Sequence, residues 1–292
     1  MSDQKLFCLG YGYTAATLAR RLCDKGWRIA GTTTREEKAQ AMQTKAVEAH
    51  LWDGGALPAG ALDDACAILV STPPGEDGCP AFAAANEAIA ERAREIQWVG
   101  YLSTNGVYGD HDGAWVDETS ALKATSPRSR RRIAAEAQWS KFAKALDLTF
   151  TVFRLPGIYG PGRSALDTVR AGAAKRIYKK GQVFSRMHVE DIAAALEAGI
   201  AHPRLHNVYN LADDEPAPPQ NVIEYACDLL SVPPPPLTPI DEADISPMAR
   251  SFYADNKRIS NKRMKEALGI KLLYPTYRDG LKAILKGETE ST

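Results

Sequence analysis

The most informative stretch of the sequence is Leu9-Gly10-Tyr11-Gly12-Tyr13-Thr14-Ala15, which has the spacing G-x-G-x-x-A. It follows an apolar run over 5–9 and precedes a helical pattern. Gly10 permits a tight turn, Gly12 leaves room for a pyrophosphate to approach the backbone, and Ala15 lets the helix pack closely on the strand. The first N–H groups of the helix would then point towards the phosphates. The stretch predicts a dinucleotide site that includes Tyr13 and Thr14; the alternative is a glycine turn that only packs.

Outward from this stretch, short apolar runs alternate with helical patterns. The expected strands cover 5–9, 27–32, 46–52, 65–70, 98–102 and 149–155, and the expected helices include 82–96 and 133–145. Strands buried on both faces appear as apolar runs, and alternation with helices indicates right-handed crossovers. The sequence therefore predicts an α/β fold, a doubly wound parallel sheet of the NAD(P)-binding Rossmann type, over residues 1–160. Residues 161–292, where the segments are shorter, are expected to form a smaller substrate lobe, with some segments returning to the first domain.

The end of the second expected strand bears on the choice of cofactor. An Asp or Glu there would bind the ribose 2′-hydroxyl of NAD. The sequence is Thr32-Thr33-Thr34-Arg35, which offers three hydroxyls and a guanidinium but no carboxylate. A guanidinium suits a 2′-phosphate because it makes charge-assisted hydrogen bonds. This segment therefore favours NADP over NAD, although Glu36 and Glu37 lower the local positive potential and Arg35 could simply be a solvated residue at a helix start.

Two further loops contribute candidate cofactor-binding residues. Asp53, after the third expected strand, could accept a hydrogen bond from the adenine amino group, or it could form a turn within Asp53-Gly54-Gly55. The fourth expected strand ends in Ser71-Thr72-Pro73. These three residues are also expected at the cofactor.

The composition excludes several classes of protein. Lys plus Arg and Asp plus Glu both total 36, so the formal net charge is zero, which argues against a protein that mainly binds nucleic acid or an anionic membrane. No apolar run approaches the ~20 residues of a membrane span, and no signal peptide is evident. The five cysteines form no C-x-x-C pair, and the five histidines show no metal-binding spacing. A cytoplasmic protein with reduced thiols and without a metal is expected.

Several later segments share a recognisable pattern. They are Ser103-Thr104-Asn105-Gly106-Val107-Tyr108-Gly109, Val116-Asp117-Glu118, Phe153-Arg154-Leu155-Pro156-Gly157-Ile158-Tyr159-Gly160-Pro161-Gly162, Met187-His188-Val189-Glu190-Asp191-Ile192-Ala193, Val208-Tyr209-Asn210-Leu211, Asp255-Asn256-Lys257 and Leu268-Gly269. Their order resembles that of the extended short-chain dehydrogenase/reductase family, which includes nucleotide-sugar epimerases and dehydratases. The resemblance covers nearly the whole chain and implies a Rossmann domain with a substrate lobe.

The resemblance also implies catalytic positions. In this family a Ser or Thr polarises the substrate carbonyl, a Tyr exchanges a proton, and a Lys four residues later lowers the tyrosine pKa and holds the nicotinamide ribose. The Ser/Thr position falls on Thr104. With Pro127 and Glu136 as anchors, the Tyr position falls on Arg128 and the Lys position on Arg132. The cofactor-binding positions that the resemblance adds are Arg132, Leu155 and Gly157.

The two arginines are a departure from the family. A guanidinium has a pKa above ~12 and no acceptor lone pair, so Arg128 cannot exchange a proton near neutral pH. Arg132 could still bind ribose hydroxyls. The usual relay is therefore broken, and such members are called atypical. The tyrosines that could replace it are Tyr108, Tyr159 and Tyr178, for each of which a structural role is the alternative.

Three other features have two interpretations each. The basic run over 128–132 is either a solvated, partly disordered loop and helix start, or an anion site for a phosphate or carboxylate substrate. His188 is expected to be buried and hydrogen-bonded rather than catalytic. Pro233–Pro236 form either a stiff loop, which we favour, or a polyproline ligand.

Two functions stay open. One is an NADP-dependent oxidoreductase or epimerase that acts on a small, anionic carbonyl or hydroxyl substrate by a non-standard relay, which the substrate-lobe signatures favour. The other is a non-catalytic NAD(P)-binding sensor or scaffold, which the loss of Tyr and Lys favours. A homodimer could form through the helix over 134–144, which is expected to expose polar side chains alongside Trp139 and Phe142.

Overall fold

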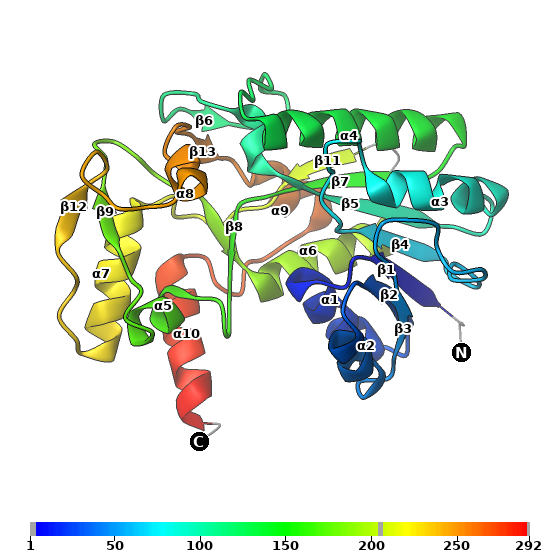
Figure 1. The fold of residues 1–292 in the computed structure, drawn as a ribbon, viewed down its shortest axis with the longest axis horizontal. Coiled ribbons are helices and arrows are strands. Elements are labelled where there is room, and N and C mark those ends of the chain that lie inside the picture. Colours follow the sequence, from blue (N-terminus) through cyan, green and yellow to red (C-terminus); the bar gives the residue numbers. More distant parts are fainter. Residues whose placement is uncertain (1–3, 204–206, 291–292) are drawn as a thin grey trace. The chain divides into compact units, whose positions relative to one another are not determined.

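The computed structural model describes residues 4–203 and 207–290 (Figure 1). Within it the chain forms two units, each assembled from separate segments. The first unit contains the residues up to Thr104 together with Pro127–Arg154 and Ala193–Tyr209. The second contains Asn105–Ser126, Leu155–Ile192 and the residues from Asn210 onward. These units are defined by contacts between residues, and the domain division at residue 160 stays a prediction.

A seven-stranded sheet organises the first unit. Its strands are β1 (Lys5–Leu9), β2 (Arg28–Thr33), β3 (Val47–Leu51), β4 (Ala67–Val70), β5 (Trp98–Thr104), β7 (Phe150–Leu155) and β11 (Asn207–Asn210). They follow the order β11-β7-β5-β4-β1-β2-β3. β1 pairs in parallel with β2 on one side and with β4 on the other. The predicted doubly wound sheet is confirmed, and it reverses its strand order beside β1, which is where open α/β sheets bind ligands.

Helices cover both faces of this sheet (Figure 1). Those on one side are α1 (Tyr13–Cys23), α2 (Glu36–Gln43) and α6 (Val189–Ala201), and those on the other are α3 (Pro80–Glu91) and α4 (Pro127–Ala145). Arg21 and Lys25 both form ion pairs with Glu197, which hold α1 against α6. The apolar strands are therefore buried on both faces, as expected for a parallel sheet.

Two helices differ from the predictions. α3 ends at Glu91, since Arg92 leaves the helical region with φ −108° and ψ 19°, and Ile96 is buried in the core outside any helix. α4 begins at Pro127, so the basic run is helical rather than partly disordered. Trp139, expected on the exposed face of α4, is instead fully buried and donates a hydrogen bond to Cys79 Sγ at 3.4 Å.

The second unit consists of short parallel strand pairs and helices. The pairs are β8 (Gly157–Tyr159) with β10 (Arg186–His188), β9 (Arg176–Tyr178) with β12 (Leu237–Pro239), and β6 (Trp115–Val116) with β13 (Arg258–Ile259). The helices are η1 (Asn105–Tyr108), α5 (Ala165–Arg170), α7 (Pro219–Leu230), α8 (Pro247–Phe252), α9 (Lys262–Leu268) and α10 (Tyr277–Glu290). Tyr159, Leu166, Ala226 and Tyr277 belong to its hydrophobic core.

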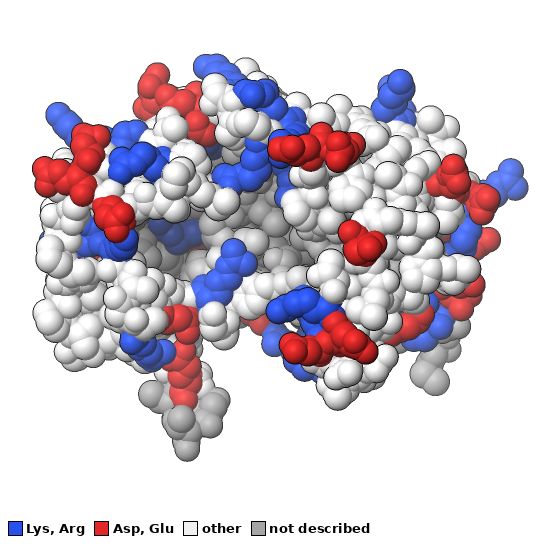
Figure 2. Space-filling model, in the orientation of Figure 1, with Lys and Arg blue, Asp and Glu red and all other residues white. Residues whose placement is uncertain are grey.

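Charged side chains of both signs lie on the surface. On the face drawn in Figure 2, Lys and Arg side chains are interspersed with Asp and Glu. Over residues 4–203 and 207–290, no helix is both long enough and apolar enough to cross a membrane. Within the same ranges, no three or more His, Cys, Asp or Glu side chains come together as metal ligands would.

Candidate functional site

The glycine loop between β1 and α1 has a backbone that requires glycine. Gly10 has φ +94°, and a Cβ atom at this position would lie 2.8 Å from Thr72 Oγ1. The Gly10 N–H donates to Thr32 Oγ1 at 2.8 Å, which fixes the turn to β2. A side chain at position 10 would therefore meet both an unfavourable φ and a steric clash.

Two hydroxyl groups at the end of β4 hold the same loop. Thr72 Oγ1 donates to the Leu9 carbonyl at 2.9 Å, and the Ser71 hydroxyl donates to the Gly10 carbonyl. The N–H groups of Ser71 and Thr72 also donate to the Leu9 carbonyl, at 2.9 and 3.1 Å. These two residues, predicted to bind the cofactor, thus position the glycine loop, and Pro73 follows them as an exposed residue.

The loop is open at Gly12. A Cβ atom at this position would meet nothing within 4 Å. Gly12 is the N-cap of α1, which begins at Tyr13, and no side chain caps the helix there. Thr14 and Ala15 are buried in the first turn, with Ala15 fully inaccessible. A helix N-terminus without a side-chain cap attracts an anion, so the residues present fit a pyrophosphate.

Two cations lie at the end of β2. Arg35 is exposed and forms the N-cap of α2, and its N–H donates to Oγ1 of the buried Thr33 at 3.3 Å, with the exposed Thr34 between them. The second cation, Lys38, was not predicted from the sequence, and its ammonium donates to the Tyr11 carbonyl in the glycine loop. Burial and then the charge of Arg35 lower the pKa of Lys38. The signal available in the sequence was that Lys38 follows Arg35 by three residues at the start of one helix.

Three other predicted cofactor residues have local roles in the structure. Asp53 Oδ1 accepts a hydrogen bond from the Gly55 N–H at 3.2 Å, which is the turn considered as its alternative role. Leu155 ends β7 and is buried, and Gly157 begins β8 and donates its N–H to the Ser185 carbonyl at 3.2 Å. Asp53 belongs to the first unit, whereas Leu155 and Gly157 belong to the second.

Arg132 occupies the position at which the family resemblance expects lysine, and β5 holds its guanidinium. Nη1 donates to the Leu102 carbonyl and lies 3.5 Å from the Tyr101 hydroxyl. The guanidinium also lies over the Tyr101 ring, 5.6 Å from its centroid. Tyr101 is fully buried, and burial raises its pKa, so it is not a substitute proton donor. Thr104, the predicted carbonyl-binding residue, is the last residue of the same strand.

The start of α4 concentrates positive charge. Arg128 and Arg130 are exposed, and no acidic residue lies in the first turn. Arg131 forms an ion pair of 2.6 Å with Glu76, in the loop between β4 and α3. Cations at a helix N-terminus are unfavourable because the helix dipole is positive there. This arrangement favours the anion-site interpretation of the basic run.

A buried ion pair joins α4 to β7 and reaches β5. Arg154 donates to Glu136 through Nη2 at 2.8 Å and through Nε at 3.2 Å. The Ser103 hydroxyl donates to the same carboxylate, and all three side chains are buried. Because Ser103 precedes Thr104, this network fixes the strand end that carries the predicted catalytic hydroxyl. The sequence analysis missed it, although an arginine inside an apolar strand requires a buried partner.

The tyrosines considered as substitute proton donors differ in accessibility. Tyr108 is fully buried and donates to Asn210 Oδ1 at 2.7 Å. Tyr159 is buried, its hydroxyl lies 3.4 Å from the Thr276 carbonyl, and burial raises its pKa. Tyr178, at the end of β9, is 40% exposed. The first two therefore have structural roles, and Tyr178 is the accessible member of the three.

His188 is buried at the end of β10, as predicted. Its Nδ1 accepts a hydrogen bond from the Glu190 N–H at 3.2 Å, and its ring packs 4.1 Å from the Tyr274 ring. Burial lowers the pKa of His188 to about 4, so the ring is neutral at pH 7. A neutral, hydrogen-bonded ring fits a structural role.

The second unit contains a polar cluster that the sequence analysis missed. The Asp213 N–H donates to the Arg186 carbonyl at 2.8 Å, and the Arg186 guanidinium lies 5.3 Å from the Tyr277 ring centroid. Arg186 Nη1, Asp213 Oδ2 and the Tyr277 hydroxyl are buried without a hydrogen-bond partner in the described part of the chain. Burial, although opposed by Arg186, raises the pKa of Asp213 to about 8. Unsatisfied buried groups indicate a missing ligand or water.

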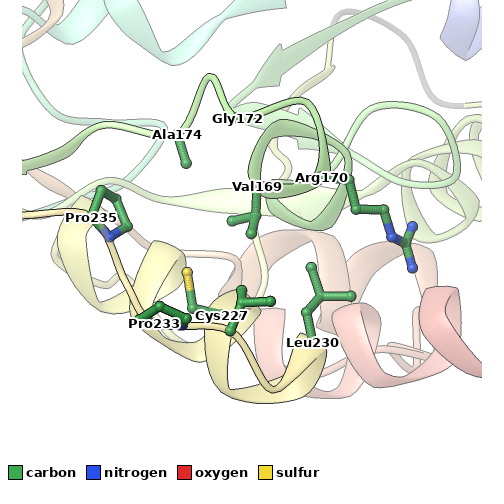
Figure 3. Close-up of a pocket in the computed structure, with 9 residues that line it drawn as sticks. Val169, Arg170, Gly172, Ala174, Cys227, Leu230, Pro233 and Pro235 are labelled. Atoms are coloured by element: carbon green, nitrogen blue, oxygen red, sulfur yellow. The ribbon is translucent and has the colours of Figure 1, made fainter.

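A second feature of this unit is an apolar pocket of about 600 Å³ beside α5 and α7 (Figure 3). Its walls include Val169, Cys227 and Leu230, with Pro233 and Pro235 from the connection that follows α7. Its one charged lining residue, Arg170, is paired with Glu288 at 2.7 Å. Two residues of the proline run therefore line the pocket.

Comparisons with known proteins give one family match and several similar proteins. The family model described as NAD dependent epimerase/dehydratase family matches residues 82–212. Protein YeeZ of Escherichia coli (strain K12) is 25% identical over 240 residues, which are 76% of this chain and 81% of that protein. A 3-diazoavenalumate denitrifying reductase of Streptomyces sp is 28% identical over 179 residues, which are 57% of this chain and 58% of that protein.

Solved structures share the whole fold. A functionally unknown conserved protein from Silicibacter pomeroyi DSS is 49% identical, with a TM-score of 0.91 over 97% of this chain and 98% of that one. The dTDP-glucose 4,6-dehydratase from Bacillus anthracis, in complex with NAD, is 17% identical, with a TM-score of 0.79 over 99% and 97%. MoeE5 in complex with UDP-glucose and NAD is 19% identical, with a TM-score of 0.78 over 99% of each chain.

The parallel sheet, its reversal at β1 and the glycine loop define a doubly wound α/β protein of the NAD(P)-binding Rossmann class. The family match makes the assignment more specific: residues 82–212 match the NAD-dependent epimerase/dehydratase family. The assignment of Arg128 and Arg132 to the positions of the family's Tyr and Lys stays a prediction.

Proposed function

We propose that this chain is an NADP(H)-dependent oxidoreductase or epimerase that acts on a small anionic carbonyl or hydroxyl substrate. The observation that carries the proposal is the pair of cations, Arg35 and Lys38, beside the glycine loop. Lys38 reaches the Tyr11 carbonyl, and the exposed Arg35 begins the same helix. A 2′-phosphate would relieve the repulsion between the two cations and make charge-assisted hydrogen bonds with them.

The chain's own residues can orient a substrate without the usual tyrosine. A bound nicotinamide supplies or accepts a hydride. The Thr104 hydroxyl, at the end of β5, donates a hydrogen bond to the substrate oxygen and so favours charge on it. Arg132, held by the Leu102 carbonyl, binds ribose hydroxyls through its remaining N–H groups and moves no proton. The exposed Arg128 holds an anionic group of the substrate, and the proton comes from solvent or from the substrate itself.

The anionic character of the substrate is supported by the start of α4, where Arg128 and Arg130 are exposed and no acidic residue lies in the first turn. MoeE5 was solved with UDP-glucose, a diphosphate ester. These observations favour a substrate with a phosphate group and argue against a neutral carbonyl compound.

Fluorescence titration with NADPH and NADH tests the cofactor, because the chain has five tryptophans. We expect NADPH to bind at least about tenfold more tightly than NADH. Arg35→Asp and Lys38→Gln should each remove most of that preference while leaving NADH affinity unchanged. Lys45→Asp, at an exposed position after α2, is the matched control and should alter neither affinity. Equal affinity of the wild type for both cofactors would exclude the NADP assignment.

Steady-state kinetics with NADPH and a panel of phosphorylated carbonyl compounds test the activity. Thr104→Ala should lower kcat by about 10²-fold, the usual effect of removing one donor to a developing oxyanion. NADPH affinity should be unchanged in this variant. Turnover that is the same in wild type and Thr104→Ala would remove Thr104 from the mechanism.

A second candidate function is a non-catalytic NADP(H) sensor, and Arg128 and Arg132 favour it because neither exchanges a proton near pH 7. This function requires tight cofactor binding without turnover of any compound in the panel. The double variant Arg128→Tyr with Arg132→Lys separates the two functions. Gain of carbonyl reduction in the double variant, with none in the wild type, would show that only the relay was missing and would favour the sensor.

A further inference from the structure

The second unit holds a polar pocket that the proposed function does not use. Its volume is about 590 Å³, within the range of about 300–1,000 Å³ that is usual for small-molecule sites. Three segments line it: the turn over 110–113 after η1, the turn over 179–182 after β9, and the segment over 254–258 that leads into β13. None of these residues is among those proposed to hold the dinucleotide.

Asn256 builds the pocket by joining the three segments. Its N–H donates to Asp110 Oδ1 at 2.7 Å, and its side-chain Nδ2 donates to the Gly181 carbonyl at 3.0 Å. Its Oδ1 accepts from the Val183 N–H at 3.2 Å. The Arg258 guanidinium also donates to the Gly113 carbonyl. The walls are therefore preformed, which lowers the entropic cost of ordering them around a ligand.

Gln182 supplies an acceptor that the chain leaves unsatisfied. This side chain lines the pocket and is 1% exposed. Its Nε2 donates to the Asp255 carbonyl at 2.8 Å, which fixes the amide orientation. Its Oε1 has no hydrogen-bond partner in the described residues. Buried acceptors are almost always paired, so this atom calls for an O–H or N–H donor from outside the chain.

The charges of the lining define the rest of the ligand. The pocket has three cations, Lys179, Lys180 and Arg258, and two carboxylates, Asp110 and Asp112. The Lys179 ammonium is held by the Tyr253 carbonyl, whereas Lys180 is exposed at the rim. The excess of positive charge favours an anion, and the carboxylate of Asp112 and Gln182 Oε1 favour hydroxyl donors on the same molecule.

We propose that this pocket binds a small phosphate ester that carries free hydroxyl groups, of the size of a monosaccharide phosphate. Lys180 and Arg258 bind the phosphate, and Gln182 Oε1 accepts a hydrogen bond from a ligand hydroxyl. A phosphate without the hydroxyls leaves Gln182 unsatisfied, and a sugar without the phosphate leaves the cations unpaired. The site thus requires both parts of the ligand.

Isothermal titration calorimetry of the full chain tests this with three probes: ribose 5-phosphate, inorganic phosphate and ribose. We expect ribose 5-phosphate to bind at least about tenfold more tightly than inorganic phosphate, since it alone satisfies both parts of the site. Ribose should show no binding. Equal affinity for ribose 5-phosphate and inorganic phosphate, or no binding of either, would overturn the proposal.

Substitutions of pocket residues test whether ribose 5-phosphate binds in this pocket. Lys180→Gln changes an exposed side chain, so the fold is retained, and it should weaken ribose 5-phosphate binding about tenfold. Gln182→Leu should reduce the preference for ribose 5-phosphate over inorganic phosphate. Lys271→Gln, at another exposed lysine of the same unit, is the matched control and should have no effect. Unchanged binding in Lys180→Gln would overturn the proposal.

Arg35→Asp distinguishes this site from the dinucleotide site, where a ribose phosphate could also bind. Ribose 5-phosphate binding that survives Arg35→Asp and persists with NADPH bound supports a separate site. Binding that Arg35→Asp abolishes would assign the probe to the dinucleotide site and reject this pocket. Failure of the NADP proposal would leave the test of Lys180 and Gln182 unaffected.

Discussion

Each of the two units contains a buried arginine beside a carboxylate, and the two arrangements differ in how completely they are bonded. In the first unit both oxygens of Glu136 accept from Arg154, and Ser103 adds a further bond. In the second unit Arg186 Nη1 and Asp213 Oδ2 have no partner among the described residues. A fully bonded pair is a structural element, whereas unsatisfied buried atoms indicate a missing ligand or water. The difference separates a group that holds the sheet together from a group that leaves hydrogen-bonding atoms for a further partner.

Glu136→Gln should give the largest effect. It leaves the buried guanidinium of Arg154 without its counter-ion, and removing one partner of a buried pair typically costs about 3–5 kcal/mol. Urea unfolding at pH 7 measures the loss. Glu95→Gln, which breaks the exposed ion pair with Arg92, is the matched control and should cost at most about 1 kcal/mol. Similar costs for the two variants would mean that the Glu136 pair is not structural.

The variant Asp213→Asn tests the incompletely hydrogen-bonded arrangement through the pH dependence of the free energy of unfolding. Burial raises the Asp213 pKa from 3.8 to about 8, so the folded state keeps a proton that the unfolded state has lost between these values. The wild type should therefore lose stability as the pH rises from about 4 to about 8, by up to about 1.4 kcal/mol per pH unit, with no further loss above pH 8.

Urea unfolding of wild type and Asp213→Asn at pH 6, 7 and 8 measures this slope. The variant has no carboxyl at this position, so its stability should change less with pH, and it should exceed the wild type most clearly at pH 8. A variant that follows the wild-type slope would show that Asp213 titrates normally and is well bonded.

Substitutions at Gly10 and Gly12 distinguish the role of the glycine loop in stability from its proposed role in phosphate binding. Gly10→Ala places a Cβ 2.8 Å from Thr72 Oγ1 at φ +94°, so it should lower stability by roughly 1–3 kcal/mol. Gly12→Ala meets nothing within 4 Å and should change stability by less than about 0.5 kcal/mol. Its methyl group would nevertheless occupy the open side of the loop and weaken NADPH binding. Thermal unfolding measures the stability of the two variants, and titration measures their affinity for NADPH. Normal NADPH affinity in Gly12→Ala would contradict the proposed phosphate position.

Thr72→Val should have only a small effect on stability. It removes the bond from Thr72 Oγ1 to the Leu9 carbonyl, which still accepts from the N–H groups of residues 71 and 72. Because the carbonyl stays bonded, the loss of stability should be about 1 kcal/mol or less. Urea unfolding gives the value. A loss comparable with that of Glu136→Gln would show that this hydroxyl alone holds the loop.

Local patterns made much of the fold predictable. The glycine spacing at 10–15 and the alternation of apolar runs with helical patterns depend on neighbouring residues, and both were identified from sequence. The burial of His188 was also predicted, because a histidine near an aspartate, here Asp191, is most often buried and hydrogen-bonded. The end of α3 was not predicted, because Ile96 continues the apolar spacing of the helix but is buried outside it.

The missed residues all depend on contacts between distant parts of the chain. Lys38 lies three residues from Arg35, but its place at the glycine loop depends on the contact of its ammonium with the Tyr11 carbonyl. Glu136 and Arg154 lie on different elements, as do Arg186 and Asp213, and no spacing rule links either pair. The sequence indicates that a buried arginine needs a partner, but the folded chain decides which carboxylate supplies it.

The interleaving of the two units has a consequence for synthesis on the ribosome. The chain passes between the units five times, and the first unit is complete only with the segment that ends at Tyr209. The edge strand β11, over 207–210, is therefore the last to join the sheet. A nascent chain that stops before this point exposes the free edge of β7, so pauses in translation before residue 210 should recruit chaperones that bind unpaired strands.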